Sequence, residues 1–331
     1  MHNTQQFACR IGNFSVAGCA PFPALMIGEQ AIPVSALHPH AQALNLPLSG
    51  THSIAALIEN WPFNQSTLVQ LAKHIERIGW AGPTLLPGAA VMHPPVSPRQ
   101  VFCTIGNYRS QLIEAFHDKA PAGTPSNETD SAAKAFIEKR RQGEPYICSK
   151  LPSALLGPTS TFSIAPHTTM ADWEVELGVV IAKPARHVTV REARDYVAGF
   201  TVVNDITFRD RVFRADPPGF GTDWLQAKDA PGCLPTGPYL IPADCVADLG
   251  QLHLSLRLNG ETMQSESTSD MIFSVYEQIA YLSSKVQLWA GDLICTGSPA
   301  GFGAHYGCYI GSGDELQASI GGFGSQHITC T

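Results

Sequence analysis

The chain has 331 residues, of which 44% are hydrophobic and 15% are charged, and its formal net charge is −7. This composition is typical of a compact globular protein and excludes a disordered chain. A negative chain without a basic block excludes nucleic acid and anionic membrane surfaces as expected partners. The nine cysteines are scattered without a C-x-x-C pair, which indicates reduced thiols rather than a disulfide framework or a zinc site.

The first residues lack the pattern of a secretory signal, because no apolar stretch follows Arg10. No run in the sequence reaches the roughly 18 apolar residues that a membrane-spanning helix requires. We therefore expect an intracellular protein and assign it to the cytoplasm. The length fits one large core together with a smaller domain.

The N-terminal part begins with three short segments that have the apolar pattern of strands: residues 7–14, 24–28 and 31–34. Residues 53–80 instead carry apolar residues at helical spacing, in two blocks that Pro62 separates. A stretch rich in proline, residues 83–98, then marks a connector. We place the domain junction at its end, with a small β-rich domain over 1–97 and a larger domain over 98–331.

The larger domain begins with a short apolar strand, residues 101–105, which runs into a polar segment. Residues 115–130 are rich in Ala, Pro, Ser and Thr, and Asp130 is expected to cap a helix that continues to Arg141. A mobile lid over a binding site would lie at such an insertion. A variable surface loop is the alternative.

An acidic pattern, Asp172-Trp173-Glu174-Val175-Glu176-Leu177, precedes a further apolar run. Side chains alternate along a strand, so Glu174 and Glu176 share one face. Adjacent carboxylates repel each other and are costly to desolvate, and a bound cation would offset both costs. Asp205 ends the next β-branched run, so three carboxylates from adjacent strands are expected to hold a hard ion: Mg²⁺, or else Mn²⁺ or Ca²⁺. The alternative is that the glutamates form the solvent face of an edge strand.

The remaining elements follow in an irregular order. The capping-box spacing of Thr189 and Glu192 predicts a helix to about Ala198, and an apolar stripe predicts another helix from Ser269 or Asp270. The Asn-Gly pair at 259–260 follows an apolar strand and predicts a hairpin. Many strands with two or three helices favour an α+β fold, mainly β, over a doubly wound sheet.

Residues 100–330 resemble the fumarylacetoacetate hydrolase family in the order and spacing of several short segments. These segments are Gly106-Asn107-Tyr108-Arg109; Lys150 to Ala154 with Gly157-Pro158; Asp172 to Leu177; Tyr196 to Asp205; Lys228; Pro235 to Pro238; Asn259-Gly260-Glu261 with Gln264; and Thr296 to Gly301. The segment before residue 98 matches little beyond the small β-rich domain that longer members carry. The resemblance implies a mixed β-roll or sandwich core with a few helices, and a homodimer joined through the core domain.

The resemblance also implies a site. It places Glu174, Glu176 and Asp205 on the ligand positions for a divalent ion, usually Mg²⁺, which chelates a small 2-oxo or β-diketo acid. Lys228 falls on the family's lysine position and would pair with developing negative charge, with a surface charge as the alternative. Arg209 is expected to hold the metal-binding strand in place.

The family pattern assigns further residues to substrate binding: Asn107, Tyr108, Arg109, Lys150, Thr296 and Gly297. Among them, Lys150 has an ion-pair role as the favoured interpretation. Thr296 and Gly297 would offer hydroxyl and backbone donors to the substrate carboxylate, and a tight turn is the alternative.

The sequence departs from the family at one catalytic position. Members usually read Asn-Tyr-x-x-His-x-x-Glu, but Gln111 stands where the histidine is expected. An amide cannot accept a proton at neutral pH. Glu114 is kept, one helical turn later, and would act as a base through water. His117, His167 or His305 could replace the missing imidazole, and a surface histidine is the alternative for each.

These features predict a Mg²⁺-dependent hydrolase that cleaves a C–C bond in an acylpyruvate or fumarylacetoacetate-like β-diketo acid, as in the catabolism of aromatic compounds. Glu114, Lys228 and Gln111 are its expected catalytic residues. The ion would stabilise the enolate left when the bond breaks. A 2-oxo acid lyase or isomerase (hydratase, decarboxylase or oxaloacetate-type tautomerase) is the alternative, which Gln111 favours. A non-catalytic metabolite-binding homologue is a third interpretation.

Overall fold

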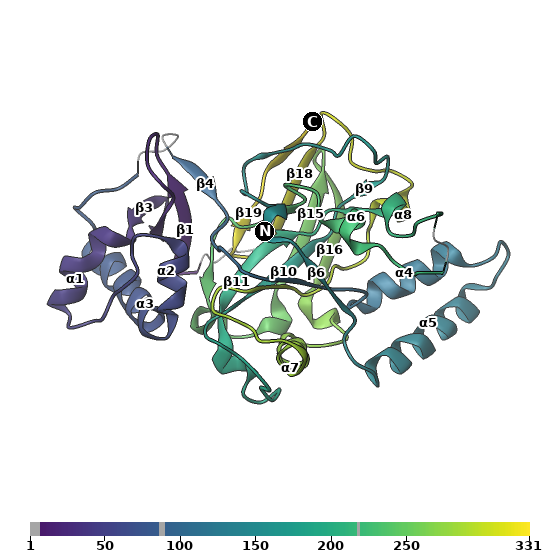
Figure 1. The fold of residues 1–331 in the computed structure, drawn as a ribbon, viewed down its shortest axis with the longest axis horizontal. Helices are drawn as coiled ribbons and strands as arrows, with labels where there is room; N and C mark the ends of the chain where they lie inside the picture. Colours follow the sequence, from purple (N-terminus) through teal and green to yellow (C-terminus); the bar gives the residue numbers. More distant parts are fainter. Residues whose placement is uncertain (1–6, 86–89, 217–218) are drawn as a thin grey trace.

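The computed structural model describes residues 7–85, 90–216 and 219–331. Two large sheets form its main part (Figure 1). The first contains, in spatial order, β14 (Ile241–Pro242), β11 (Val197–Asn204), β10 (Val175–Ile181), β17 (Leu293–Cys295), β5 (Val101–Thr104) and β6 (Ile147–Lys150). The second contains β16 (Glu261–Ser267), β15 (His253–Leu258), β18 (Glu315–Ile320), β20 (Ile328–Cys330) and β8 (Thr161–Phe162), with β19 (Gly324–Ser325) beside β18. Strands β10 and β11 contact β15 and β18, so the sheets pack as the predicted sandwich within an α+β fold.

Strand β10 lies in the middle of the first sheet. It pairs antiparallel with β11 from Val175 opposite Asn204 to Ile181 opposite Val197, and its other side pairs with β17. All of its residues are buried, because both faces of the sheet are covered and the apolar run fits that position. The acidic pattern therefore ends on a central strand, and the alternative of an edge strand facing solvent is wrong.

Helices lie around the sandwich. The hairpin of α4 (Arg109–Lys119) and α5 (Ser126–Arg141) projects from one side, at the right of Figure 1. The other helices of this part are α6 (Trp224–Lys228), α7 (Val275–Lys285) and α8 (Gly303–Tyr306). Two small sheets are also present: β9 (Ala171–Asp172) pairs with β12 (Thr207–Phe208), and β7 (Leu155–Leu156) pairs with β13 (Leu234–Pro235). Within the described ranges, no helix is long and apolar enough to cross a membrane.

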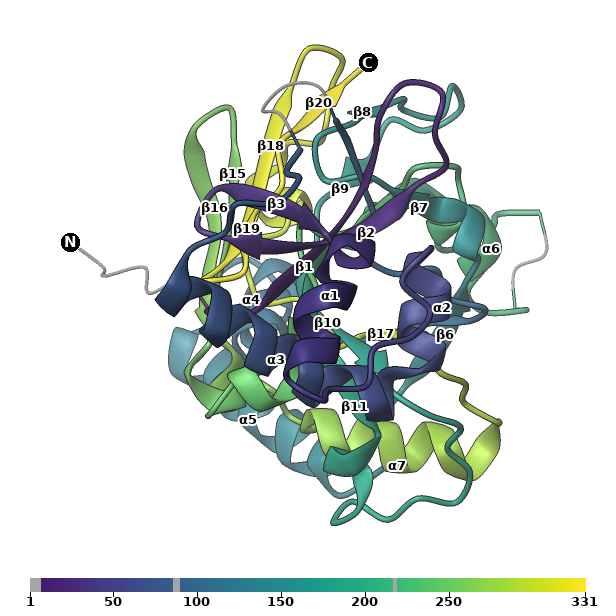
Figure 2. The same ribbon diagram turned by 90° about the vertical axis from the view of Figure 1, so that its left-hand side faces the viewer.

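The N-terminal unit combines one sheet with helices that cover it (Figure 2). Its sheet runs β3 (Gln30–Pro33), β2 (Phe22–Ile27), β1 (Arg10–Ser15) and β4 (Val91–His93), and its helices are α1 (His38–Ala43), α2 (Ile54–Glu59) and α3 (Trp61–Ile78). Pro62 lies in the first turn of α3, where a proline is tolerated. The expected connector contributes β4, which pairs with β1.

Three predicted helices begin or end elsewhere. Thr189 and Glu192 make the expected capping contacts, yet they lead only into a 3-10 turn, and the β-branched run of β11 starts at Val197. Helix α7 begins at Val275 rather than near Ser269, because a capping box at Ser274 fixes its start. The helix expected from Asp130 starts earlier, at Ser126. The hairpin at 259–260 is confirmed, with φ of 50° and 84° at these two residues.

Candidate metal centre and acid–base cluster

Three carboxylates meet where β10 begins and β11 ends. Glu174 and Glu176 flank the first residue of β10, and Asp205 follows the last residue of β11. The register places these ends side by side, and the Asp205 N–H donates to the Glu174 carbonyl at 2.8 Å. One carboxylate oxygen from each residue lies within 4.8 Å of the other two. Glu174 is 7% exposed and the other two are fully buried.

The donor set fits a hard divalent cation. Glu176 Oε1 is buried, and no residue in the described parts of the chain offers it a hydrogen bond. Burial, reinforced by the charges of Asp205 and Glu174, raises the pKa of Glu176 well above its usual value. A cation among these three residues would satisfy the free oxygen and offset the repulsion. Carboxylate oxygens are the ligands that Mg²⁺ prefers.

Two lysines hold Asp205. Lys150 Nζ lies 2.6 Å from Asp205 Oδ1, and Lys228 Nζ lies 2.6 Å from Oδ2. Burial by itself would raise the pKa of Asp205, but the two ammonium groups outweigh it and lower that pKa. The carboxylate is therefore kept ionised.

The two lysines differ in their remaining contacts. Lys150 Nζ also donates to the carbonyls of Ile206 and Cys233, so it is used within the protein. Lys228 Nζ bonds Thr207 Oγ1 at 2.7 Å and lies 3.5 Å from Glu174 Oε2, between two of the carboxylates. Because Lys228 is buried, the alternative of a surface charge is wrong.

Arg209 also supports the metal centre, through a contact with Glu174. Its guanidinium lies 2.8 Å from Glu174 Oε1 and donates to Asp172 Oδ2 at 2.8 Å. Asp172 in turn accepts a hydrogen bond from the Gly303 N–H at 2.7 Å. These contacts agree with the expected supporting role of Arg209 and fix the side chain of Glu174.

Several residues assigned to substrate make their hydrogen bonds inside the protein. Asn107 Nδ2 donates to the carbonyls of Phe273 and Thr296, at 3.0 and 2.8 Å. The Thr296 hydroxyl donates to the Leu177 carbonyl at 2.9 Å, and the Gly297 N–H donates to Glu176 Oε2 at 2.7 Å. The contact from Gly297 orients the Glu176 carboxylate, whereas the other contacts tie backbone segments together. A direct role of these residues at the substrate stays a prediction.

The motif at the start of α4 has a similar supporting position. Arg109 donates to the carbonyls of Asp270 and Met271, at 2.9 and 2.7 Å, and so ties α4 to the loop before α7. The Tyr108 hydroxyl is buried and has no hydrogen-bond partner in the described ranges. Burial, then the negative charge of Glu176, raises the pKa of Tyr108. It is a protonated donor, and its contact with substrate stays a prediction.

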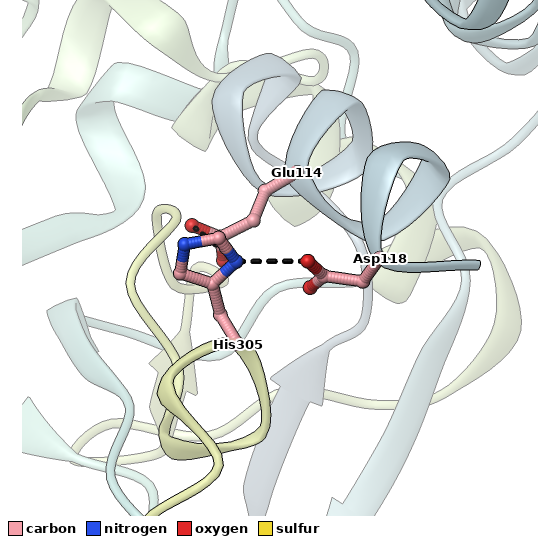
Figure 3. A group of neighbouring side chains, drawn as sticks. All are labelled: Glu114, Asp118 and His305. Atoms are coloured by element: carbon pink, nitrogen blue, oxygen red, sulfur yellow. Dashed lines mark hydrogen bonds and ion pairs between the residues drawn. The ribbon is translucent and has the colours of Figure 1, made fainter. Parts of the chain in front are cut away.

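The expected base, Glu114, lies in a second cluster (Figure 3). Its carboxylate accepts the Gly301 N–H at 2.9 and 3.0 Å. His305 Nδ1, from α8, lies 3.8 Å from Glu114 Oε2 and 2.9 Å from Asp118 Oδ1. Of the candidate histidines, His305 is thus beside Glu114, whereas His117 pairs with an aspartate of α5.

One segment connects the two clusters. Gly297 bonds Glu176, and four residues later Gly301 bonds Glu114. The Gly301 carbonyl accepts the indole N–H of Trp173, the neighbour of Glu174, at 2.9 Å. The acid–base cluster and the carboxylates are therefore held by the same short loop.

Sequence reasoning did not identify Asp118 or Asp172. Asp118 could have been found from the sequence, because it follows Glu114 by four residues and therefore lies on the same face of a helix. Asp172 lies in the acidic pattern itself, but its partners come from distant segments.

Comparisons with known proteins agree with this geometry. The family model "Fumarylacetoacetate (FAA) hydrolase C-terminal" matches residues 100–330. The human mitochondrial oxaloacetate tautomerase FAHD2B is 39% identical over 179 residues, which is 54% of this chain and 56% of that protein. A 2,4-didehydro-3-deoxy-L-rhamnonate hydrolase from Sphingomonas sp. (strain SKA58) is 37% identical over 186 residues, or 55% of this chain and 64% of that protein. The matched part thus spans 56% to 64% of the length of these relatives.

A solved structure shows the fold over almost the whole chain. The fumarylacetoacetate hydrolase from Exiguobacterium antarcticum superposes with a TM-score of 0.70 at 22% identity, and the match covers 98% of this chain and 99% of that one. The family model, in turn, spans the two large sheets, the carboxylate triad and Glu114. The chain therefore belongs to the fumarylacetoacetate hydrolase family.

Proposed function

We propose that this chain is a Mg²⁺-dependent hydrolase that cleaves a C–C bond in an acylpyruvate-type β-diketo acid. The observation that carries the proposal is a buried triad of carboxylates joined by one loop to a separately held carboxylate, Glu114. The triad would hold the ion, and Glu114 would move protons beside it. Mn²⁺ and Ca²⁺ remain alternatives for the ion.

The residues divide the chemistry between them. A divalent ion held by Glu174, Glu176 and Asp205 would supply Lewis-acid stabilisation of the enolate that forms when the C–C bond breaks. Lys228 stays protonated, since the adjacent Asp205 carboxylate raises its pKa against the effect of burial, and offers positive charge to a substrate oxygen. Glu114 would take a proton from the attacking water, held in place by the Gly301 N–H.

An oxaloacetate-type tautomerase is the second candidate. Two observations favour it: Gln111 replaces the family's histidine, and the human relative at 39% identity is named an oxaloacetate tautomerase. Tautomerisation needs proton transfer at the substrate carbon but no activated water. It would use the same triad and the same base.

One assay separates the two candidates. Purified protein loaded with Mg²⁺ is incubated with a panel of acylpyruvates and with enol-oxaloacetate, and products are identified by mass spectrometry and ultraviolet absorbance. Cleavage of an acylpyruvate, lost by a factor of about 10²–10⁴ in Glu114→Gln, supports the hydrolase. Rapid loss of the enol without cleavage of any acylpyruvate would reject it in favour of the tautomerase.

We also propose a homodimer joined through the core domain, acting in the cytoplasm on a product of aromatic catabolism. Family membership supports the assembly. A divalent ion held by the triad, together with Lys228, would supply the positive charge that attracts a small acidic substrate. Sedimentation that shows a monomer at micromolar concentration would reject the dimer. The human relative is named as mitochondrial, so the compartment has to be measured by fractionation.

A further inference from the structure

A cluster of titratable side chains lies outside the carboxylate triad, between α4 and α8 (Figure 3). The imidazole of His305 lies between Glu114 and Asp118, with Nδ1 at 3.8 Å from Glu114 Oε2 and at 2.9 Å from Asp118 Oδ1. The two carboxylates come from one face of α4, and the histidine comes from a helix 187 residues further along the chain. The fold therefore brings an imidazole to the expected base.

Asp118 orients the imidazole of His305 and favours its protonated form. At 2.9 Å, the Nδ1–H of His305 donates to the Asp118 carboxylate, and this hydrogen bond orients the ring. The hydrogen bond to Asp118, followed by the charges of Glu114 and Asp118, raises the pKa of His305 above its usual value. Among the described residues, the further titratable group beside His305 is Tyr306, whose ring centroid lies 5.0 Å from that of the imidazole and whose hydroxyl donates to the Met263 carbonyl.

Gln111 cannot replace an imidazole beside Glu114. It lies one turn before Glu114 on α4, and its Oε1 is buried without a hydrogen-bond partner in the described ranges. An amide does not titrate, so it neither carries positive charge nor accepts a proton.

We propose that His305, oriented by Asp118, supplies the imidazole that position 111 lacks and acts on Glu114 as its positioning residue. As an imidazolium it attracts the Glu114 carboxylate, which lies 3.8 Å from Nδ1, and so holds in place the group that accepts the proton. The proposal rests on the proposed function, because it assigns the base of that reaction. It covers hydrolysis and tautomerisation alike, since both begin with proton removal by Glu114.

The kinetic test uses His305→Gln in the full-length, Mg²⁺-loaded protein. We expect kcat to fall about tenfold or more, with KM changed less than twofold. The acidic limb of the kcat/KM profile should move up by about half a unit to one unit, the effect of losing one unit charge near 4 Å at a partly exposed site. The matched control is His117→Gln on α4, the helix of Glu114. The imidazole of His117 pairs with Asp130, so this variant should leave both quantities unchanged.

A rescue variant separates this role from a structural one. Placing an imidazole at the usual family position, Gln111→His in the His305→Gln background, should restore most of kcat and return the acidic limb toward its original position. If His305→Gln leaves the profile where it was, or if the second substitution restores nothing, the proposal is wrong.

A measurement without substrate keeps the proposal testable if neither reaction is found. The C2 proton of His305 is titrated by NMR in the wild type, in Asp118→Asn and in Glu114→Gln. We expect an apparent pKa above the usual value of about 6.5 that falls by half a unit or more in each variant. An unchanged His305 titration in Glu114→Gln would overturn the proposal. A coupled titration in a protein that turns over neither substrate would instead reject the proposed function.

Discussion

At the scale of single residues, Glu176 presents the sharpest electrostatic problem in the molecule. Its carboxylate is fully buried, one oxygen accepts the Gly297 N–H, and the other has no partner in the described ranges. The nearby charges of Asp205 and Glu174 oppose its ionisation. A buried charge without a full set of partners costs several kcal/mol, so the metal-free protein carries a penalty that a cation would remove.

The first prediction tests this penalty with Glu176→Gln. The variant should lose the Mg²⁺-dependent rise in melting temperature, because one ligand charge is gone. Its metal-free form should melt at or above the wild-type temperature, since repulsion within the triad is relieved. Differential scanning fluorimetry with EDTA and with saturating Mg²⁺ checks both, with Glu315→Gln, at the exposed first residue of β18, as the control. A full Mg²⁺ response in Glu176→Gln would contradict the assignment.

The second prediction concerns the lysines around Asp205. Lys150→Met leaves that buried carboxylate with a single ammonium group, so the free energy of unfolding should fall by about 3–5 kcal/mol. Urea denaturation measures it. Lys285→Met, at an ion pair with Glu144 on the surface, is the control and should change stability by less than about 1 kcal/mol. Equal effects in the two variants would show that Lys150 does not hold Asp205.

The residues of the triad were predictable because strand alternation and a β-branched run are local patterns. The contacts made by the other site residues were harder to predict from the sequence. The position of His305 beside Glu114 depends on a contact across 187 residues, which no local pattern records. Asn107 and Thr296 were assigned to substrate from the family pattern, and the structure shows that both also bond the backbone.

At the scale of elements, the loop between β17 and α8 determines how the two clusters sit relative to each other. Gly301 has φ of +94°, and a Cβ there would lie 2.0 Å from the Met263 carbonyl oxygen. Only glycine allows the backbone to pass so close, and the same residue holds Glu114 through its N–H.

The third prediction is therefore Gly301→Ala. A left-handed conformation alone costs an alanine about 1–2 kcal/mol, and the clash with Met263 adds to that cost. Glu114 should also shift, so kcat should fall while the control, Gly307→Ala, keeps its activity. Gly307 has φ of +65° with no atom within 4 Å of its Cβ position, so it reports the conformational cost alone. Equal losses of stability in the two variants would mean that the close approach is unimportant.

Element boundaries show where local patterns fail. Thr189 and Glu192 make their capping contacts, yet the segment turns into β11 because Val197 and the residues after it pair with β10. Tertiary pairing outweighs a weak helix signal there. Helix α7 starts at Val275 because the residue before it, Ser274, has a glutamate three residues later that completes the capping box.

At the scale of the whole molecule, the N-terminal unit and the sandwich share one hydrophobic core. Buried side chains from both, such as Leu57 and Val101, belong to a single continuous cluster. The backbones of Ile11 and Leu240 also exchange two hydrogen bonds, at 3.0 and 2.8 Å. The predicted junction near residue 97 separates stretches of sequence, but apolar packing continues across it.

The last prediction follows from that continuity. If the core is one cooperative unit, calorimetry of the full chain should give a single transition, with equal calorimetric and van't Hoff enthalpies. Leu71→Ala, in a buried position of α3 far from the metal centre, should lower that transition for every probe, because its cost of about 2–5 kcal/mol is shared by the whole unit. The double variant Trp61→Phe/Trp80→Phe keeps tryptophans only at positions 173, 224 and 289, so its near-ultraviolet signal reports the larger domain, including Trp173 beside the carboxylate triad. Two transitions, of which only the lower one moves in Leu71→Ala, would show that the N-terminal unit folds independently and that the shared apolar contacts do not couple it to the site.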